Sequence, residues 1–196
     1  MPGGNPNPST IPHMTNRFRS ITVAAALLVP ALATAQSTTK AFGTSSRIFN
    51  VGILTGGDYE GFGIGASFEK GVYEFTPSLT LGLGAFAGFV KGDVGQSNGF
   101  EYNVTQIPVM AIGNVHLAIP SQPNLDVYGG LSLGIVRFSS SFDGAAPTGF
   151  DDASSSDLGL GIQVGARYAF TPKVTAFGQL GVNDIPLLYA GLSFNF

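Results

Sequence analysis

The sequence contains no cysteine and no tryptophan, and few of its side chains carry a charge. The absence of cysteine excludes a disulfide framework and a thiolate metal site. Charged residues make up 11% of the chain, well below the roughly 25% that is typical of soluble domains. The formal net charge of −3 also offers no electrostatic attraction to a nucleic-acid partner. An ordinary soluble globule and a nucleic-acid-binding protein are therefore both disfavoured.

Long hydrophobic runs are also missing from the body of the chain. The one marked apolar run, residues 21–32, is shorter than the ~20 residues that a membrane-spanning helix needs, and Pro30 interrupts it. It follows a basic stretch and precedes Ala33-Thr34-Ala35, a small-x-small cleavage site. Residues 14–35 are therefore interpreted as a secretory signal peptide that is cleaved after Ala35, and not as a transmembrane helix.

The signal peptide divides the N-terminal part of the chain. Met14 is the expected start of translation, and residues 1–13, which are rich in Pro and Gly, are interpreted as a spurious extension. Export and cleavage then leave residues 36–47 as a short periplasmic N-terminal segment.

What the chain has in abundance is glycine, with 28 residues, and two-faced alternation. Beyond the N-terminal segment, apolar side chains alternate with small or polar ones, which is the period of a β-strand. In residues 157–170, for example, the apolar residues share one parity while Gly, Gln and Arg share the other. Eight strands are expected, at residues 48–55, 61–70, 77–90, 103–117, 125–138, 157–170, 173–182 and 187–196.

The connections between these strands alternate in character. Three are short and contain proline, which lacks an N–H and ends strand pairing; two share Phe-Thr-Pro and the third spans 119–124. The others are acidic and rich in Gly or Ser, and the longest are 91–102 and 139–156. Short turns at one end and long polar loops at the other are the pattern of a membrane barrel. The 139–156 loop is therefore expected outside the cell and the 120–124 turn in the periplasm.

Two kinds of barrel fit the alternation, and they differ in where the apolar face points. A soluble, lipocalin-like barrel holds its apolar face inside and exposes Lys, Glu and Arg on the other face. Here the polar face carries mostly Gly, Ser, Thr, Asn and Gln, which suits a narrow lumen, while the nearly uncharged apolar face suits lipid. The predicted fold class is an all-β, eight-stranded, up-and-down antiparallel transmembrane β-barrel over residues 48–196.

The last strand completes this pattern. One face of residues 187–196 carries Leu188, Ala190, Leu192, Phe194 and Phe196, and the sequence reaches Ser193-Phe194-Asn195-Phe196. A bare apolar strand in water would invite pairing with other chains, whereas it makes sense as the strand that closes a barrel in lipid. With the signal peptide and the Gly-rich strands, this ending resembles the small outer-membrane β-barrel family of OmpA-, OmpX-, OmpW- or opacity-like type. The resemblance implies the outer membrane of a Gram-negative cell and an assembly signal for the insertion machinery at Phe194, Phe196 and Tyr189.

Few charged residues share the inward parity of the strands, and they are Glu69, Asp126, Arg167 and Lys173. Charge inside a narrow lumen is normally paired, so these residues predict a structural network that plugs the barrel. A gate or small ion path is the alternative interpretation. His116 has the same parity and, as a single histidine, is interpreted as a satisfied lumenal or rim residue.

No catalytic residue, metal site or cofactor is expected. Lipid A deacylases, which are enzymatic outer-membrane barrels, carry a His-x-Ser element, whereas His116-Leu117-Ala118 lacks the serine. An acidic cluster does not have the spacing of an EF-hand and is interpreted as a solvated loop; it consists of Asp143, Asp151, Asp152 and Asp157.

These observations favour a barrel with a structural or surface-interaction role, because eight strands leave little open channel. A narrow porin-like channel for small solutes or ions is the second interpretation, and a lipid-modifying enzyme is a distant third. The expected partners are outer-membrane lipid, lipopolysaccharide and, through the last strand, the insertion machinery. The barrel is expected to be a monomer.

Overall fold

The computed structural model of the chain describes residues 40–56, 61–97, 100–143 and 153–196. The predicted signal peptide and the predicted extension before it lie outside these residues. Eight strands make up most of the described part: β1 (Arg47–Thr55), β2 (Phe62–Thr76), β3 (Leu79–Ser97), β4 (Phe100–Ala118), β5 (Leu125–Asp143), β6 (Ala153–Ala169), β7 (Val174–Asn183) and β8 (Leu188–Asn195).

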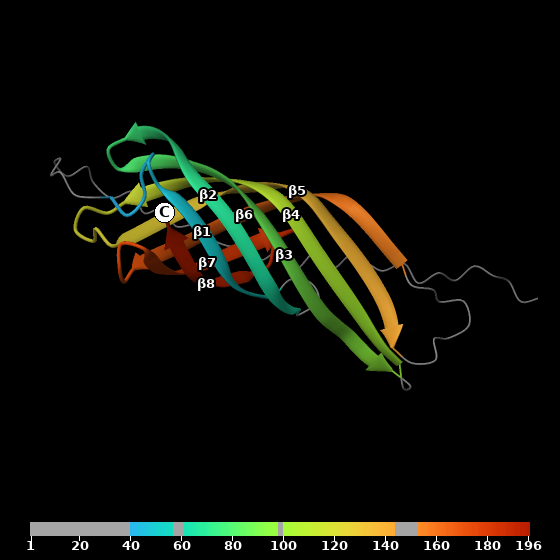
Figure 1. Cartoon of the computed structure of the whole chain (residues 1–196). Helices are drawn as coiled ribbons and strands as arrows, with labels where there is room; N and C mark the ends of the chain where they lie inside the picture. The colour runs from blue at the N-terminus through green and yellow to red at the C-terminus, as the bar shows by residue number, and fades with distance from the viewer. Residues whose placement is uncertain (1–39, 57–60, 98–99, 144–152) are drawn as a thin grey trace, which may run out of the picture. The chain divides into compact units, whose positions relative to one another are not determined.

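The strands form one closed barrel, in which each strand pairs with its neighbours in the sequence and β1 pairs with β8 (Figure 1). All of these pairings are antiparallel, so the predicted eight-stranded up-and-down barrel is confirmed. Closure gives every strand a ladder partner on both sides, which satisfies backbone N–H and C=O groups where no water is present. No helix in the described part of the chain is long and apolar enough to cross a membrane.

The two ends of the barrel differ. At the end called here the turn end, strands are joined by the short connections 77–78, 119–124 and 170–173. At the opposite end, called the extended end, β3, β4 and β5 reach 19 residues each and β6 reaches 17, whereas β1 has 9 and β8 has 8. In Figure 1, β3 to β6 therefore run on beyond the other four strands.

The strands at the extended end are longer than the sequence predicts. Loops are predicted at 91–102 and 139–156, whereas β3 and β4 leave only residues 98–99 between them and β5 continues to Asp143. These polar residues lack apolar alternation and so give no periodic signal. They are strands because each hairpin supplies its own ladder, as in the pairing of Thr105 with Ser139.

The acidic cluster is affected by the same correction. Asp143 ends β5 and Asp157 lies within β6, so these two belong to strands and not to a loop. Asp151 and Asp152 lie outside the described residues.

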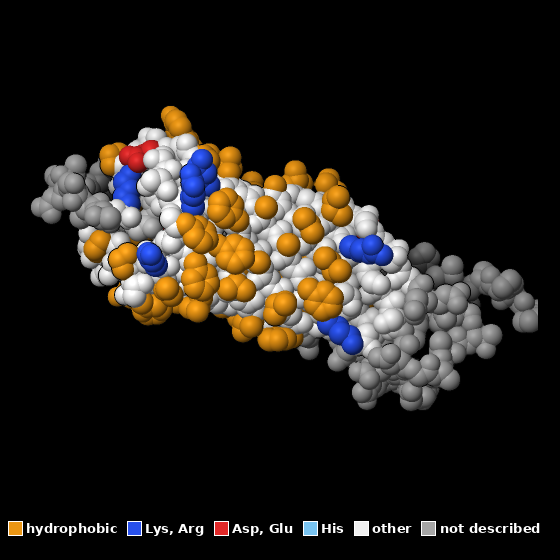
Figure 2. Space-filling model, viewed as in Figure 1, with side chains coloured by type: hydrophobic (Ala, Val, Ile, Leu, Met, Phe, Trp, Pro, Cys, Tyr) orange, Lys and Arg blue, Asp and Glu red, His pale blue; other side chains and the backbone are white. Residues whose placement is uncertain are grey.

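The outer wall of the barrel is apolar, as the alternation predicts. In β6 every second residue from Leu158 to Tyr168 is exposed, and Leu158 reaches 78% exposure. Figure 2 shows the apolar side chains of the near face of the barrel as a belt, with basic side chains on either side of it. In a membrane this belt meets hydrocarbon and not water.

The interior of the barrel is filled in two layers. Toward the extended end lies an apolar cluster, which consists of Leu54, Phe86, Val90, Met110, Val136, Phe177, Ile185 and Tyr189. Ile185 belongs to the β7–β8 connection, which folds into the barrel mouth and is held by a 2.9 Å hydrogen bond from the Leu160 N–H to Asp184 Oδ2. Toward the turn end the interior is polar and charged.

Candidate functional site

Four charged side chains form a closed ring inside the barrel near its turn end. Arg167 donates a hydrogen bond to Glu69 over 2.6 Å and another to Asp126 over 3.1 Å. Across the ring, His116 Nε2 lies 2.8 Å from Glu69 Oε1 and Nδ1 lies 2.9 Å from Asp126 Oδ2. Acidic and basic groups therefore alternate around the ring. None of the four residues is more than 3% exposed, so the ring is sealed from solvent.

The strands bring these side chains to the inner wall from different directions. Asp126 on β5 and Arg167 on β6 are direct cross-strand neighbours. Glu69 on β2 and His116 on β4 are separated by β3, and they meet across Gly82 of that strand. A Cβ at Gly82 would contact both the Glu69 carboxylate and His116 Nε2. The close approach of two side chains over β3 thus requires a glycine there.

The hydrogen-bond pattern defines the charge of the ring. A carboxylate only accepts hydrogen bonds, so both ring nitrogens of His116 must donate when Glu69 and Asp126 are ionised. The imidazole is then a cation, and with Arg167 it balances the two carboxylates. Such charge-assisted contacts are the strong kind of hydrogen bond. A buried ring of zero net charge avoids the large cost of leaving an ion unpaired.

Polar side chains extend the ring toward the middle of the barrel. Asn114 donates from Nδ2 to Glu69 Oε1 over 2.9 Å, and its Oδ1 accepts a hydrogen bond of 2.9 Å from Gln163. Tyr128 lies beneath the Arg167 guanidinium, with its ring centroid 4.4 Å away. This is a cation–π geometry, which stabilises a desolvated cation.

The segment ahead of β1 covers the ring on its other side. Phe42 is 2% exposed and stacks on the His116 ring with centroids 3.6 Å apart. The segment is tied to β2, because the Gly71 N–H donates to the Ser46 carbonyl over 3.0 Å. Part of the predicted periplasmic N-terminal segment, 36–47, thus lies inside the barrel as a plug.

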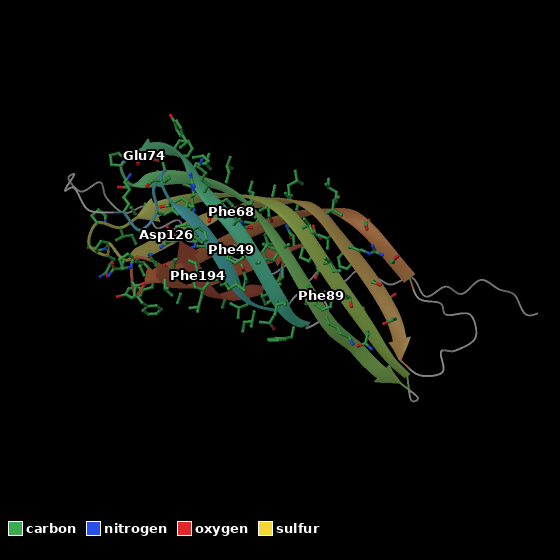
Figure 3. All side chains as sticks on the ribbon, in the orientation of Figure 1. Phe49, Phe68, Glu74, Phe89, Asp126 and Phe194 are labelled. Atoms are coloured by element: carbon green, nitrogen blue, oxygen red, sulfur yellow. The ribbon has the colours of Figure 1, made fainter. Side chains whose placement is uncertain are left out.

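The structure brings together Glu69, Asp126 and Arg167, the predicted lumen charges, but not Lys173. Lys173 is exposed in the turn between β6 and β7, where β6 has already ended, so its strand parity does not apply. The missing cation is His116, which sequence reasoning treats as an isolated residue. Its inward parity was visible, but its two acidic neighbours come from other strands. In Figure 3, Asp126 is labelled near the turn end.

Two of the residues predicted to form the assembly signal, Phe194 and Tyr189, lie on opposite faces of β8, and Phe196 directly follows the strand. Phe196 is 75% exposed and Phe194 is half-buried on the outer wall. Tyr189 is 2% exposed inside the barrel, where it donates to the Gly65 carbonyl over 3.3 Å.

A small cavity lies inside the barrel. It lies between the ring and the apolar cluster, and the space that the centre of a water molecule can occupy there is about 10 Å³. Its lining includes Ser132, Gln163 and Ile185. A cavity of this size holds about one water. The Ser132 hydroxyl is buried without a protein partner and borders this cavity.

The contacts within the ring limit what His116 can do chemically. Both nitrogens of His116 are used by carboxylates, so neither is free to activate a nucleophile. In the described part of the chain, no group of His, Asp and Glu side chains has the arrangement of a metal site.

Comparison with known proteins agrees with this fold. Residues 21–193 match the family described as outer membrane protein beta-barrel domain. The chain belongs to this family. No curated protein matches the sequence. The family places the barrel in the outer membrane.

The solved structures that are similar to this chain include three of Ail, the attachment invasion locus protein of Yersinia pestis. The crystal structure shares 15% identity with a TM-score of 0.45, covering 78% of this chain and 95% of that one. The backbone structure in a phospholipid bilayer nanodisc shares 13% identity with a TM-score of 0.44, covering 78% and 99%. The complex with the heparin analogue sucrose octasulfate shares 14% identity with a TM-score of 0.44, covering 76% and 93%.

Proposed function

We propose that this protein is a closed outer-membrane barrel whose protruding sheet, formed by the extended ends of β3 to β6, binds other proteins at the cell surface. The observation that carries the proposal is the free edge of β6. The pairing of β6 with β7 begins only at Gly161, so in the described residues Ala153–Gly159 have β5 as their one ladder partner. A row of unpaired N–H and C=O groups is a template for another strand.

The direction of the free backbone groups follows from the neighbouring hydrogen bonds. The Leu160 N–H donates away from β5, to Asp184 Oδ2, and the Leu160 carbonyl accepts from the Asp184 N–H. Because the pattern repeats every second residue, Ser154, Ser156 and Leu158 present their backbone groups to the free side. An extended peptide can add there as a further strand, with main-chain hydrogen bonds supplying the affinity.

The experiment tests the backbone of this edge separately from its side chains. Ser156→Pro removes one N–H from the free side and should reduce binding to a protein partner by about tenfold or more, while Ser156→Ala should leave it unchanged. Binding of purified extracellular proteins to the barrel in nanodiscs can be measured by surface plasmon resonance. Equal binding by the two variants, or by a barrel lacking residues 153–157, would reject the proposal.

A narrow channel is the competing function. The charged ring, the apolar cluster and Phe42 all oppose it because they fill the interior. The cavity beside Ser132 favours it, since a water there could be part of a longer path. Planar-bilayer recordings of the inserted barrel should be silent. Steady conductance that changes in Glu69→Gln would establish a pore.

Assembly and surroundings complete the proposal. Residues 14–35 act as a cleaved signal peptide, and the monomeric barrel lies among phospholipid and lipopolysaccharide. The insertion machinery recognises the last strand through Phe194, Phe196 and Tyr189. Phe196→Asp should therefore lower the yield of heat-modifiable barrel more than Asn195→Asp does, because Phe196 faces lipid and is 75% exposed. Equal yields of the two variants would count against this role.

A further inference from the structure

Two basic side chains lie directly opposite each other on the outer wall at the turn end. Arg47 of β1 is paired in register with Lys70 of β2, and both are exposed. Among the described residues, neither forms an ion pair with an acidic group. Like charges directly opposite on neighbouring strands are destabilising. An anion between them would remove that cost.

Among the described residues, the exposed acidic side chain nearest to Lys70 in the sequence is Glu74, and it already has a partner. Glu74 forms a 2.6 Å ion pair with Lys40. Lys173 is also exposed at the turn end, so positive charge exceeds negative charge on this rim. In the described part of the chain, no acidic side chain therefore forms an ion pair with Arg47 or Lys70.

A row of phenylalanines lies one step nearer the middle of the apolar belt. Phe49 on β1 is paired with Phe68 on β2 and with Phe194 on β8. Phe49 and Phe68 are 39% and 43% exposed, and Figure 3 labels all three on the same stretch of wall. On the same face, Arg47 lies two residues from Phe49 along β1, and Lys70 lies two residues from Phe68 along β2. Apolar rings next to paired cations match the two halves of a lipid molecule.

We propose that Arg47 and Lys70 hold the phosphate of an anionic glycerophospholipid in the leaflet at the turn end, with its acyl chains on Phe49, Phe68 and Phe194. The guanidinium and ammonium groups donate hydrogen bonds to the phosphate oxygens, and the rings pack against the upper part of the chains. The site is separate from the protruding sheet and does not depend on its function.

The other edge of the apolar belt offers a matched control. Lys91 of β3 and Arg137 of β5 are also exposed and basic, but Lys91 is paired with Thr105 and Arg137 with Ile107. They are therefore not opposite each other. Neutralising this pair changes the net charge as much as neutralising Arg47 and Lys70 does.

The test uses the absence of tryptophan from the chain. Ala85→Trp places a single fluorophore beside Phe68, its cross-strand partner, and keeps both cations and all three phenylalanines of the site. The barrel is placed in phosphatidylcholine vesicles that contain either brominated phosphatidylglycerol or brominated phosphatidylcholine as the quencher. The lipid occupancy beside the tryptophan, derived from the quenching, should be about threefold higher for phosphatidylglycerol than for phosphatidylcholine. Arg47→Gln with Lys70→Gln should abolish this preference, whereas Lys91→Gln with Arg137→Gln should preserve it.

Each other result overturns the proposal. If the Ala85→Trp barrel shows no preference for phosphatidylglycerol over phosphatidylcholine, the site does not exist. If both double variants lose that preference equally, it is a general effect of net charge. A stronger preference for lipid A than for phosphatidylglycerol would show that the bound phosphate does not belong to a glycerophospholipid. If the Ala85→Trp barrel does not fold, native mass spectrometry of lipid retained by the tryptophan-free barrels makes the same comparison. Retention by wild type and the Arg47/Lys70 variant must then differ for the proposal to survive.

Discussion

The two halves of the barrel interior are filled by different chemistry. Near the turn end, a ring of four buried charges holds β2, β4, β5 and β6 together through directional contacts. Near the extended end, the interior is filled by an apolar cluster with side chains such as Phe86 and Met110. An apolar cluster tolerates changes of shape at constant volume, whereas a charged ring fails when one member is lost. The comparison leads to four predictions about the free energy of unfolding, measured by urea titration of the barrel in lipid vesicles.

The largest effect is expected when the ring loses a cation. Arg167→Met leaves Glu69 and Asp126 buried with only His116 between them and should lower the free energy of unfolding by about 3–5 kcal/mol. Lys173→Met removes a cation from the same end but from an exposed turn, so it should change the value by less than about 0.5 kcal/mol. Similar values for the two variants would mean that the ring does not stabilise the fold.

A smaller effect is expected when the apolar half loses volume. Met110 is 1% exposed, and Met110→Ala should cost about 2–4 kcal/mol through lost burial and the cavity left behind. Met110→Leu keeps the volume and should cost less than about 1.5 kcal/mol. If the Leu variant were as unstable as the Ala variant, the apolar half would be as demanding in shape as the ring.

The plug at the turn end should contribute less than either layer. Phe42→Ala removes a ring that stacks on His116 at 3.6 Å and should cost about 1–2 kcal/mol, because the aromatic contact and part of the apolar burial are lost. Phe42→Leu should recover roughly half of the loss. A destabilisation as large as that of Arg167→Met would place Phe42 within the ring as an equal member.

The smallest effect is expected at a neutral polar contact. Ser193 donates to Asn50 Oδ1, and Asn50 in turn donates to Ser67 over 2.8 Å, which links β8, β1 and β2. Ser193→Ala should lower the free energy of unfolding by about 1 kcal/mol, since the side-chain oxygen Oδ1 of Asn50 loses its hydrogen-bond donor. Ser154→Ala, at an exposed strand position, serves as the control and should be neutral. A loss above about 3 kcal/mol would show that neutral contacts inside this barrel equal the charged ones.

Much of the fold was predictable because lipid demands a simple pattern. The alternation within 157–170 indicated which side chains point outward, and the structure has them on the outer wall. Residues 91–97 have no such alternation, and this part of β3 was predicted as a loop. Parity also identified Glu69, Asp126 and Arg167 as inward charges. It did not identify the partner of each, because a partner depends on register between distant strands.

The sequence alone therefore determined the class of fold, the apolar belt and the inward position of the charges, because each follows from period-two alternation in a strand. Only the tertiary structure decided that His116 joins two carboxylates, that Lys173 stays outside, and that Phe42 caps the ring. The stagger of strands in a closed barrel sets which inward side chains share one level, and Gly82 leaves the space through which Glu69 reaches His116. Neither the stagger nor that open space is written in the pattern of any single strand.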